Sequence, residues 1–564
     1  MKSFTKKLVL PLVMLLAVAT QIAAENAPTR AKNGMVISQS DIASKVGVDV
    51  LEDGGNAIDA AVATAFALAV THPSAGNIGG GGFLIFRPAS GEPVAFDFRE
   101  MAPAKATDTM WLESGEYSYE RHHRSYLSVG VPGTVAGMRM AWEEYGSLAW
   151  QRLLEPAIRI AQDGFVVSDG LARSLDRSME RMGKYPATKA QFTKNGAPFE
   201  AGDILKQAEL GESLIRIAED GARGFYEGKT ARLIAEEMAK NGGLITEEDL
   251  KAYRAKKRAP IRGTYRGVEI ISMPPPSSGG IVLVEMLNIL EGYDVAGDGF
   301  GSARNLHRMA ESMRRAYSDR AHYLGDPDFN PDMPIERLTS KEYAAQLRRT
   351  IQPDRASRST PDSFEWPKES PETTHYSIVD ADRNAVSVTY TLEFGYGSGI
   401  VVPGAGFLLN NEMGDFNGAP DLTDDTGLIG TKPNLVGPHK RMLSSMTPTI
   451  VAKDGELFMV TGTPGGRTII NTVLQTILNV VDHDMNAQAA VDAGRIHHQW
   501  LPDRISYERQ SFSPDTLNIL TWLGHDLRER TNQGSAHVIV VDLEDEVLEG
   551  GVDRRSSTSG VASY

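Results

Sequence analysis

The sequence predicts an α/β protein, because strand patterns and helical patterns both recur along the chain. Residues Pro371 to Thr391 alternate apolar and polar side chains on both sides of a polar turn, which is typical of a β-hairpin. Residues Ala57 to Val70 are apolar on nearly every face, which predicts a helix buried in a core. The section between them contains successive amphipathic helical patterns, at residues 152–163, 208–219 and 229–240.

The length and composition are those of a globular protein. The 564 residues are enough for several domains or for one large α/β unit, and length alone does not decide between them. Apolar residues make up 41% of the chain and charged residues 23%, which excludes a disordered protein. The net charge of −15, with lysine and arginine thinly spread, argues against nucleic acid or an anionic membrane as a partner.

Residues 1–24 have the pattern of a secretory signal peptide. Three lysines precede the apolar residues Leu8 to Ala19, which are too few to cross a bilayer, and cleavage is expected after Ala24. A retained anchor is the alternative, and the polar residues that follow at once disfavour it. Loss of the three lysines takes the net charge from −15 to −18. The chain has no cysteine for disulfides or thiolate metal sites, which suits a bacterial periplasm.

Two helices are expected at the start of the mature chain. Residues Ser40 to Glu52 have helical spacing and end at a glycine pair. Asn56 is the expected N-cap of the helix Ala57 to Val70, and Asp59 lies in its first turn, where a carboxylate is favourable.

A glycine-rich run, Gly76 to Gly82, precedes the strand-like residues Phe83 to Arg87. A nucleotide-binding loop would instead open a helix, and no Gly-Lys-Ser/Thr follows, so close backbone packing is the preferred interpretation.

Arg99 is a candidate ligand-binding residue. It follows the strand-like residues Pro93 to Phe98, and its fork of donors suits a ligand carboxylate. A structural ion pair with Asp97 or Glu100 is the alternative.

Two histidine pairs, His122–His123 and His497–His498, raise the question of a metal site. Adjacent residues do not share a helix face, and no spaced carboxylate or third ligand completes either set, so no metal is predicted.

The predicted hairpin brings two threonines together at its base. If residues 381–384 form the connection, Thr373 lies opposite Leu392, or opposite Thr391 if one strand contains a one-residue bulge. The alternative is that these threonines are ordinary strand residues with high β-propensity. Residues 354–372, just before Thr373, are polar and rich in proline and serine, which is the most linker-like composition in the chain.

Three carboxylates follow the hairpin closely in sequence. Glu393 lies two residues after Thr391 and is expected on the same strand face. Glu412 and Asp415 follow a predicted short strand, residues 407–410. Because no Ca²⁺-type spacing is present, the three carboxylates are interpreted as a receptor for an ammonium group, with a solvated acidic surface as the alternative.

A strand–turn–helix pattern near the C-terminus is a candidate anion site. The strand Leu457 to Thr461 enters the turn Gly462 to Gly466, and the helix Thr468 to Val481 follows. Free backbone N–H groups at the positive end of a helix are the components of an oxyanion hole. A phosphate could also bind there, but the lysine that would help is absent.

The sequence as a whole resembles the γ-glutamyltranspeptidase family, across essentially the entire mature chain. The segments that carry the resemblance are residues 97–101 (DFREM), 274–280 (PPPSSGG), 373–377 (TTHYS), 409–413 (LNNEM), 443–446 (LSSM) and 463–466 (TPGG). The TTHYS and LSSM segments, in this order and spacing, are highly specific for the family.

The resemblance implies an N-terminal-nucleophile hydrolase with a stacked α/β/β/α fold, made as a precursor that cuts itself. The cut is expected between Glu372 and Thr373, through an N-to-O shift, and gives a large chain of residues 25–372 and a small chain of residues 373–564. The freed α-amine of Thr373 then acts as the base for its own hydroxyl. Glutathione is the expected donor, and water, amino acids or dipeptides are the expected acceptors.

The resemblance also assigns a role to each site residue. Thr391 is implied to orient the nucleophile, and Gly465 and Gly466 to form the oxyanion hole. Arg99, Ser444 and Ser445 are implied to hold the α-carboxylate of a γ-glutamyl group, and Glu393, Glu412 and Asp415 its α-ammonium. No cofactor and no metal are expected.

The chain departs from some relatives in this site. Some bacterial members have Asn in place of Glu393 and Gln in place of Glu412, and where lidded relatives have Tyr in the loop 420–430, this chain has Thr426. Two alternatives remain: a cephalosporin (glutaryl) acylase of the same fold, and an inactive periplasmic binding protein. The acidic residues disfavour the acylase, and Thr373 with the glycine pair disfavours the inactive protein.

Overall fold

The computed structural model describes residues 27–359, 373–420 and 431–564. The predicted signal peptide, Glu372 with most of the predicted linker, and Thr426 with most of the predicted lid lie outside the described residues. Within the described residues, we find no helix with the length and apolarity that a membrane span requires.

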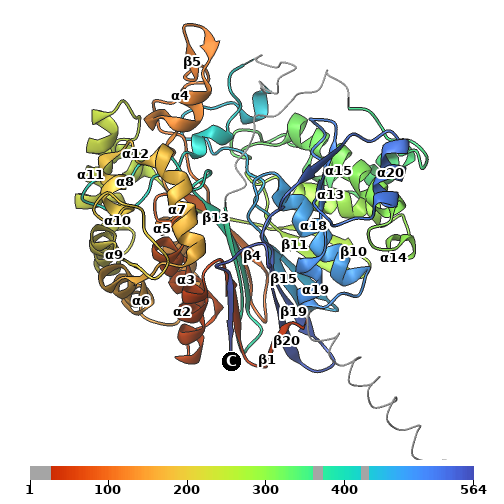
Figure 1. The fold of residues 1–564 in the computed structure, drawn as a ribbon, viewed down its shortest axis with the longest axis horizontal. Helices are drawn as coiled ribbons and strands as arrows, with labels where there is room; N and C mark the ends of the chain where they lie inside the picture. The colour runs from red at the N-terminus through yellow and green to blue at the C-terminus, as the bar shows by residue number, and fades with distance from the viewer. Residues whose placement is uncertain (1–26, 360–372, 421–430) are drawn as a thin grey trace, which may run out of the picture.

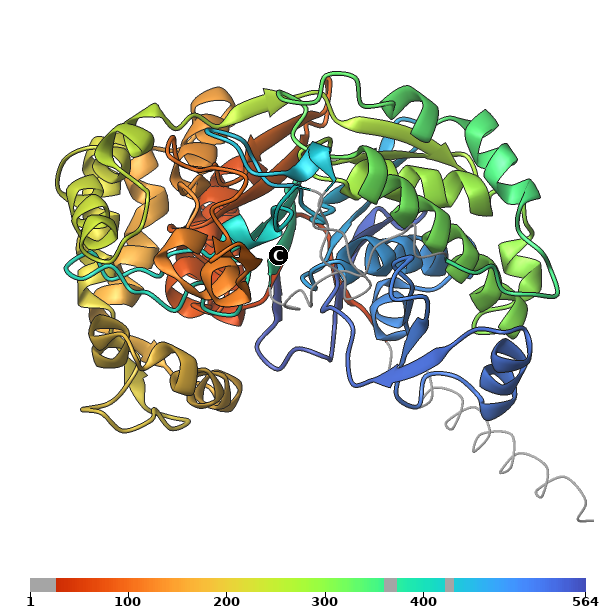
Figure 2. The same ribbon diagram turned by 90° about the horizontal axis from the view of Figure 1, so that it is seen from above.

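Two large sheets lie face to face and helices cover both outer faces, which gives four layers (Figures 1 and 2). Among the described residues each sheet has seven strands. In spatial order, the first sheet contains β21 (Gly560–Ser563), β2 (Met35–Ser38), β12 (Thr374–Val379), β13 (Ala385–Thr391), β3 (Gly81–Arg87), β4 (Val94–Phe98) and β9 (Lys256–Arg258). The second contains β1 (Thr29–Ala31), β20 (Val547–Val552), β19 (His537–Asp542), β15 (Glu456–Gly462), β14 (Thr449–Lys453), β11 (Val268–Ser272) and β10 (Ile261–Tyr265).

Each sheet shares a hydrophobic core with its own helical layer. The first sheet packs against α2 (Asp41–Glu52), α3 (Ala57–Thr71), α5 (Thr134–Tyr145) and α6 (Trp150–Asp163). The second packs against α13 (Gly279–Leu290), α15 (Ala303–Tyr323) and α18 (Thr468–Val481), and the inner face of the first sheet, including Phe83 and Ile85, joins this second core. The predicted α/β class and the α/β/β/α stack are confirmed.

The other described elements complete the helical layers or connect the elements named above. The helices are α4 (Tyr119–Arg124), α7 (Asp169–Met182), α8 (Pro186–Gln191), α9 (Ala208–Asp220), α10 (Arg223–Tyr226), α11 (Gly228–Lys240), α12 (Glu247–Ala252), α14 (Val295–Asp298), α16 (Ile335–Leu338), α17 (Lys341–Arg349), α19 (Ala487–Asp492) and α20 (Pro514–Trp522), with the 3₁₀ turns η1 (Tyr126–Ser128), η2 (Glu412–Asp415) and η3 (Lys432–Asn434). The short strands are β5 (Leu112–Glu113), β6 (Glu116–Tyr117), β7 (Phe165–Val166), β8 (Ile204–Leu205), β16 (Ile496–His497), β17 (Ile505–Glu508) and β18 (Leu527–Arg530).

The helix predictions are confirmed to within two residues at each start. Asn56 caps α3, and its side chain and that of Asp59 form a reciprocal capping box. Every residue of α3 is buried, as its uniformly apolar sequence requires.

The glycine-rich run before β3 packs closely against neighbouring backbone. A Cβ atom at Gly79, Gly80 or Gly81 would collide with the carbonyl oxygen of Leu408, Thr391 or Phe98, respectively. The interpretation as close backbone packing is confirmed, and the run leads into β3, which pairs with β13 on one side and β4 on the other.

The hairpin register differs by one residue from the direct count. Val379, and not Asp380, pairs with Ala385, so the connection has five residues and the continued register brings Thr373 opposite Thr391 without a bulge. The cause is Asp380, whose Oδ1 accepts hydrogen bonds from the backbone N–H groups of Asp382 (3.1 Å) and Asn384 (2.9 Å). Because of these hydrogen bonds, Asp380 belongs to the turn and not to the strand.

The prediction of a strand at residues 407–410 is wrong. Leu408 forms only an isolated bridge to Val401. The next residues bond to different partners, because Leu409 N–H donates to Ile400 and Asn410 N–H donates to Gly79. The segment is therefore irregular, although it leads into η2 as expected.

Candidate active site

A small pocket, open to solvent, lies at the base of the β12–β13 hairpin. Its wall brings together residues that lie far apart in sequence, and it includes every predicted site residue in the described part of the chain except Gly465. The lining residues are Arg99, Thr373, Thr391, Glu393, Glu412, Asp415, Ser444, Ser445, Met446, Gly466 and Ile469.

The two threonines lie at the end of the hairpin, between the sheets. Thr373 immediately precedes β12 and Thr391 ends β13, and both side chains are buried. Thr391 Oγ1 accepts a hydrogen bond from the backbone N–H of Glu393 at 2.9 Å. Because its oxygen serves as an acceptor there, the hydroxyl proton of Thr391 can be donated to another group in the pocket.

Glu393 reaches the pocket by a different route from the one predicted. The strand ends at Thr391, so the two residues do not share a strand face. Glu393 instead has a φ of +74°, in the left-handed region that a side chain rarely adopts. The turn is fixed because Asn411 donates its N–H to Leu392 O at 3.0 Å, and its side-chain oxygen accepts from Phe394 N–H at 3.1 Å.

Arg99 is fully buried and its guanidinium is bound by carboxylates. Its terminal nitrogens form ion pairs with Glu412 and Asp415, and Glu100 lies 3.6 Å away. The guanidinium Nε also donates to the carbonyl of Met442 at 3.3 Å. Of the two alternative ion pairs, the one with Glu100 is present at 3.6 Å. The one with Asp97 is wrong, because Arg258 and Arg441 bind the Asp97 carboxylate.

The carboxylates around Arg99 outnumber its single positive charge. Burial raises the pKa of Glu100 to about 7, although Arg99 opposes the shift. Burial likewise raises the pKa of Glu412 well above its ordinary value, and the nearby Glu100 and Asp415 add to the effect. Glu393 and Glu412 are 7% and 1% exposed, so the interpretation of a solvated acidic surface is wrong for this cluster. Such a site favours a bound cation.

Ser444 and Ser445 line the side of the pocket formed by the second core. Ser445 Oγ accepts a hydrogen bond from Arg320 at 3.0 Å, and Arg320 also donates to Ser278 Oγ at 2.8 Å. Arg320 was not found from the sequence. Its position in α15, three residues after the buried Tyr317, is the one sign that it faces the core.

The predicted oxyanion turn joins β15 to α18. Gly465 and Gly466 have φ values of +138° and +54°, which favour glycine, and α18 begins at Thr468 as predicted. Thr468 Oγ1 donates to the carbonyl of Gly465 at 2.8 Å and holds the turn against the helix. Of the two glycines, Gly466 lines the pocket.

Both histidine pairs are buried and engaged by protein groups. His497 Nδ1 lies 2.7 Å from the side-chain amide of Asn471, and His498 Nε2 lies 3.3 Å from Asp503. His122 and His123 lie against the pocket, where His123 contacts Glu393. This contact was not anticipated from the sequence.

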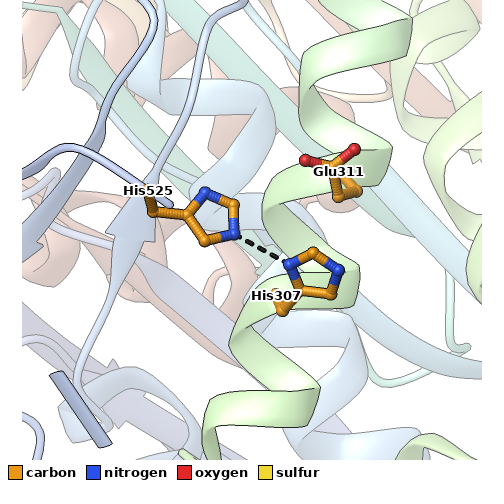
Figure 3. Close-up of side chains that lie close together, drawn as sticks. All are labelled: His307, Glu311 and His525. Atoms are coloured by element: carbon orange, nitrogen blue, oxygen red, sulfur yellow. Dashed lines mark hydrogen bonds between the residues drawn. The ribbon is translucent and has the colours of Figure 1, made fainter. Parts of the chain in front are cut away.

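One group of three potential metal ligands occurs among the described residues: His307, Glu311 and His525 (Figure 3). The two imidazoles form a 2.8 Å hydrogen bond with each other, drawn as a dashed line. Glu311 forms ion pairs with two arginines. These arginines make the position unfavourable for a cation, and the cluster is explained as a network that also holds the backbone at Gln352 and Ser357.

Comparison with known proteins places this geometry in a family. Residues 43–563 match the family model of γ-glutamyltranspeptidase. The chain is 50% identical over 542 residues to the glutathione hydrolase proenzyme of Escherichia coli, covering 95% of this chain and 93% of that protein.

Solved structures agree with this assignment. A cephalosporin acylase from Bacillus halodurans has a TM-score of 0.83 at 28% identity, covering 96% of this chain and 97% of the other. A γ-glutamyltranspeptidase chain from Helicobacter pylori has a TM-score of 0.55 at 48% identity, covering 56% of this chain and 91% of the other. The four-layer fold of an N-terminal-nucleophile hydrolase is therefore confirmed, and the chain belongs to the γ-glutamyltranspeptidase family.

Proposed function

We propose that this protein is a γ-glutamyltransferase and glutathione hydrolase. It cleaves the γ-glutamyl amide of glutathione and related compounds and passes the γ-glutamyl group to water, an amino acid or a dipeptide. Support comes from the family membership, from the relative named glutathione hydrolase proenzyme, and from a pocket suited to an amino-acid head group.

The charge balance of the pocket carries this proposal. Among the described residues of its wall, Arg99 is the single arginine, against the three carboxylates Glu393, Glu412 and Asp415. Glu412 Oε2 is buried and has no hydrogen-bond partner among the described residues. An α-ammonium group would satisfy this oxygen and balance the carboxylates, while Arg99, Ser444 and Ser445 would receive the α-carboxylate.

The nucleophile in this proposal is the hydroxyl of Thr373. In the precursor this hydroxyl attacks the Glu372 carbonyl, and the acyl group shifts from nitrogen to oxygen, which frees the Thr373 α-amine. Water then hydrolyses the ester, which releases the Glu372 carboxylate and the Thr373 hydroxyl and separates the two chains. The chain thereby becomes a large chain of residues 25–372 and a small chain of residues 373–564. The α-amine, with an ordinary pKa near 7.7–8.0, serves as the base for the adjacent hydroxyl.

Catalysis follows from the same groups. The Thr373 hydroxyl attacks the γ-carbonyl carbon and its proton passes through the α-amine to the leaving amine, so that cysteinylglycine departs from glutathione. Thr391 donates a hydrogen bond that orients the nucleophile. Backbone N–H groups at Gly465 and Gly466 stabilise the oxyanion at the positive end of α18. Water or an acceptor amine then attacks the γ-glutamyl ester and restores Thr373.

A glutaryl acylase is the second candidate, because the cephalosporin acylase has a closely similar fold. A glutaryl group has a carboxylate but no α-ammonium, so it would leave the pocket carboxylates unbalanced. This physical difference favours the γ-glutamyl donor. An inactive binding protein is disfavoured because Thr373, Thr391 and the glycine turn are all present.

Turnover of two matched donors tests the proposal. The purified protein is assayed with γ-glutamyl-p-nitroanilide and glutaryl-p-nitroanilide, each with and without glycylglycine. We expect kcat/KM at least tenfold higher for the γ-glutamyl donor, and an increased rate with glycylglycine. Equal kcat/KM for both donors would contradict the assigned role of the carboxylates.

We also propose that the protein is exported to the periplasm. Support comes from the signal-peptide pattern of residues 1–24 and the absence of cysteine.

A further inference from the structure

The short helix α4 lies against the part of the pocket that would bind the α-ammonium group. His122 Nε2 lies 3.2 Å from the carbonyl oxygen of Met413, in the middle of η2. The side-chain amide of Asn411 donates to the carbonyl of His123 at 3.2 Å. The helix therefore contacts η2, which carries Glu412 and Asp415.

His123 also contacts the third carboxylate. Its Nδ1 lies 3.4 Å from Glu393 Oε1, and the two side chains are 4% and 6% exposed. Since the Glu393 carboxylate accepts hydrogen bonds, the neutral imidazole satisfies this contact when its proton is on Nδ1. Burial lowers the pKa of His123 to about 3, which is consistent with a neutral ring.

Aromatic rings fix the orientation of this imidazole. The ring of His123 stacks on Phe394 with an interplanar angle of 6° and a centroid distance of 5.8 Å. Tyr119 lies 4.4 Å away and His122 lies 4.3 Å away, between ring centroids. The imidazole is thus held on several sides and cannot turn away from Glu393 without repacking.

The backbone of η2 lies in close contact with the side chains of His123 and Glu393. A Cβ atom at Gly414 would lie 2.7 and 2.8 Å from the two carboxylate oxygens of Glu393, and it would also collide with His123 Nδ1. His123, Glu393 and Gly414 therefore form one close contact, and Gly414 belongs to η2, which also carries Glu412 and Asp415.

We propose that His123 is a positioning residue for recognition of the α-ammonium group. By donating its Nδ1–H to Glu393, it holds one carboxylate oxygen and presents the other side of the carboxylate to the donor substrate. This inference rests on the proposed function. His123 acts through Glu393 and does not contact the reacting atoms, so its loss should weaken donor binding more than the chemical step.

Substitutions that separate ring packing from hydrogen bonding test the inference. His123→Phe keeps the stacked ring and removes the donor, and we expect KM for γ-glutamyl-p-nitroanilide to rise about tenfold with kcat within about twofold, as for a lost hydrogen bond to a charged group. His123→Asn retains an N–H near the position of Nδ1 and should restore KM to within about threefold. If His123→Phe does not fold, His123→Gln serves as the second loss variant, because its amide extends beyond Nδ1.

Two further measurements distinguish a positioning role of His123 from a general loss of structure: inhibition constants, and the same substitution made in a Glu393→Gln variant. The ratio of Ki for glutarate to Ki for L-glutamate should fall about tenfold in His123→Phe, because glutarate lacks the ammonium group. In a Glu393→Gln background the same substitution should change KM less than twofold. An unchanged KM in a folded His123→Phe enzyme, or an equal rise in the Glu393→Gln background, would overturn the inference alone. A wild-type protein that does not cleave the γ-glutamyl anilide would overturn the proposed function as well.

Discussion

Arg99 donates a hydrogen bond to Glu412 inside the pocket, although the two residues were predicted to bind opposite charges of one substrate. The pairing means that each group compensates the other before any donor arrives. A zwitterionic donor can bind here by replacing these ion pairs. Its carboxylate would then pair with Arg99, and its ammonium group would pair with the carboxylates of the pocket. The donor would thus enter a network in which Arg99 already compensates part of the carboxylate charge, and its ammonium group would compensate more of it.

Removing Arg99 should therefore damage both stability and binding. In Arg99→Gln, the buried Glu412 and Asp415 lose their counter-ion, and we expect the free energy of unfolding to fall by about 3–5 kcal/mol. Urea denaturation measures this loss. Arg152→Gln is a matched control at an exposed ion pair with Asp53 and should cost less than about 1 kcal/mol. Equal losses in the two variants would contradict a buried network.

Asp415→Asn should raise KM for a donor that carries an α-ammonium group and not for a donor that lacks one. The substitution removes a negative charge from the ammonium receptor, and we expect KM for γ-glutamyl-p-nitroanilide to rise roughly 10- to 100-fold. KM for the glutaryl anilide should be unchanged or lower, because a repulsive carboxylate is gone. Steady-state kinetics with both donors measure the difference, and a similar rise for both would indicate a structural effect.

Glu100 should make stability depend on pH near neutrality. Burial raises its pKa from 4.5 to about 7 in the folded state. The folded protein then binds a proton that the unfolded chain has released, so this contribution is fully present below about pH 4.5 and is lost as pH rises through 7. The full shift corresponds to about 3 kcal/mol.

The variant Glu100→Gln tests this linkage because glutamine stays neutral. Urea denaturation between pH 5 and pH 8.5 should show a smaller fall in stability for the variant than for the wild type. The exposed Glu92→Gln is the control and should retain the wild-type pH dependence. A variant that loses stability with pH as steeply as the wild type would exclude Glu100 as the source.

Gly414 should be intolerant of even one additional carbon. In Gly414→Ala the new methyl group would collide with Glu393 and His123, and we expect KM for the γ-glutamyl donor to rise at least tenfold. Gly437→Ala is the control, because no atom lies within 4 Å of a Cβ added there. Donor kinetics on both variants should separate them, and a wild-type KM in Gly414→Ala would show that the contact is not critical.

Much of the fold could be predicted from local patterns. The capping box at Asn56, the buried helix α3 and the turn before α18 follow from rules that act within a few residues. The hairpin register could not be counted correctly, because the Asp380 carboxylate lengthens the turn through side-chain hydrogen bonds.

The candidate site was predicted mostly through family resemblance, and its supporting contacts were not. The contact of His123 with Glu393 joins residues 270 positions apart, and that of Arg320 with Ser445 spans 125 positions. Periodicity shows which face of an element is buried, but it does not show which distant side chain lies opposite. The left-handed turn at Glu393 is likewise imposed by tertiary hydrogen bonds of Asn411.

In the proposed function, Thr373 becomes the nucleophile when a cut frees its α-amine. Intact-mass analysis and N-terminal sequencing of the purified protein test this most directly. We expect two chains from the wild type, with the small chain beginning at Thr373, and one uncut and inactive chain from Thr373→Ala. A small chain that begins at any other residue, or an active wild-type protein that remains one chain, would contradict the account.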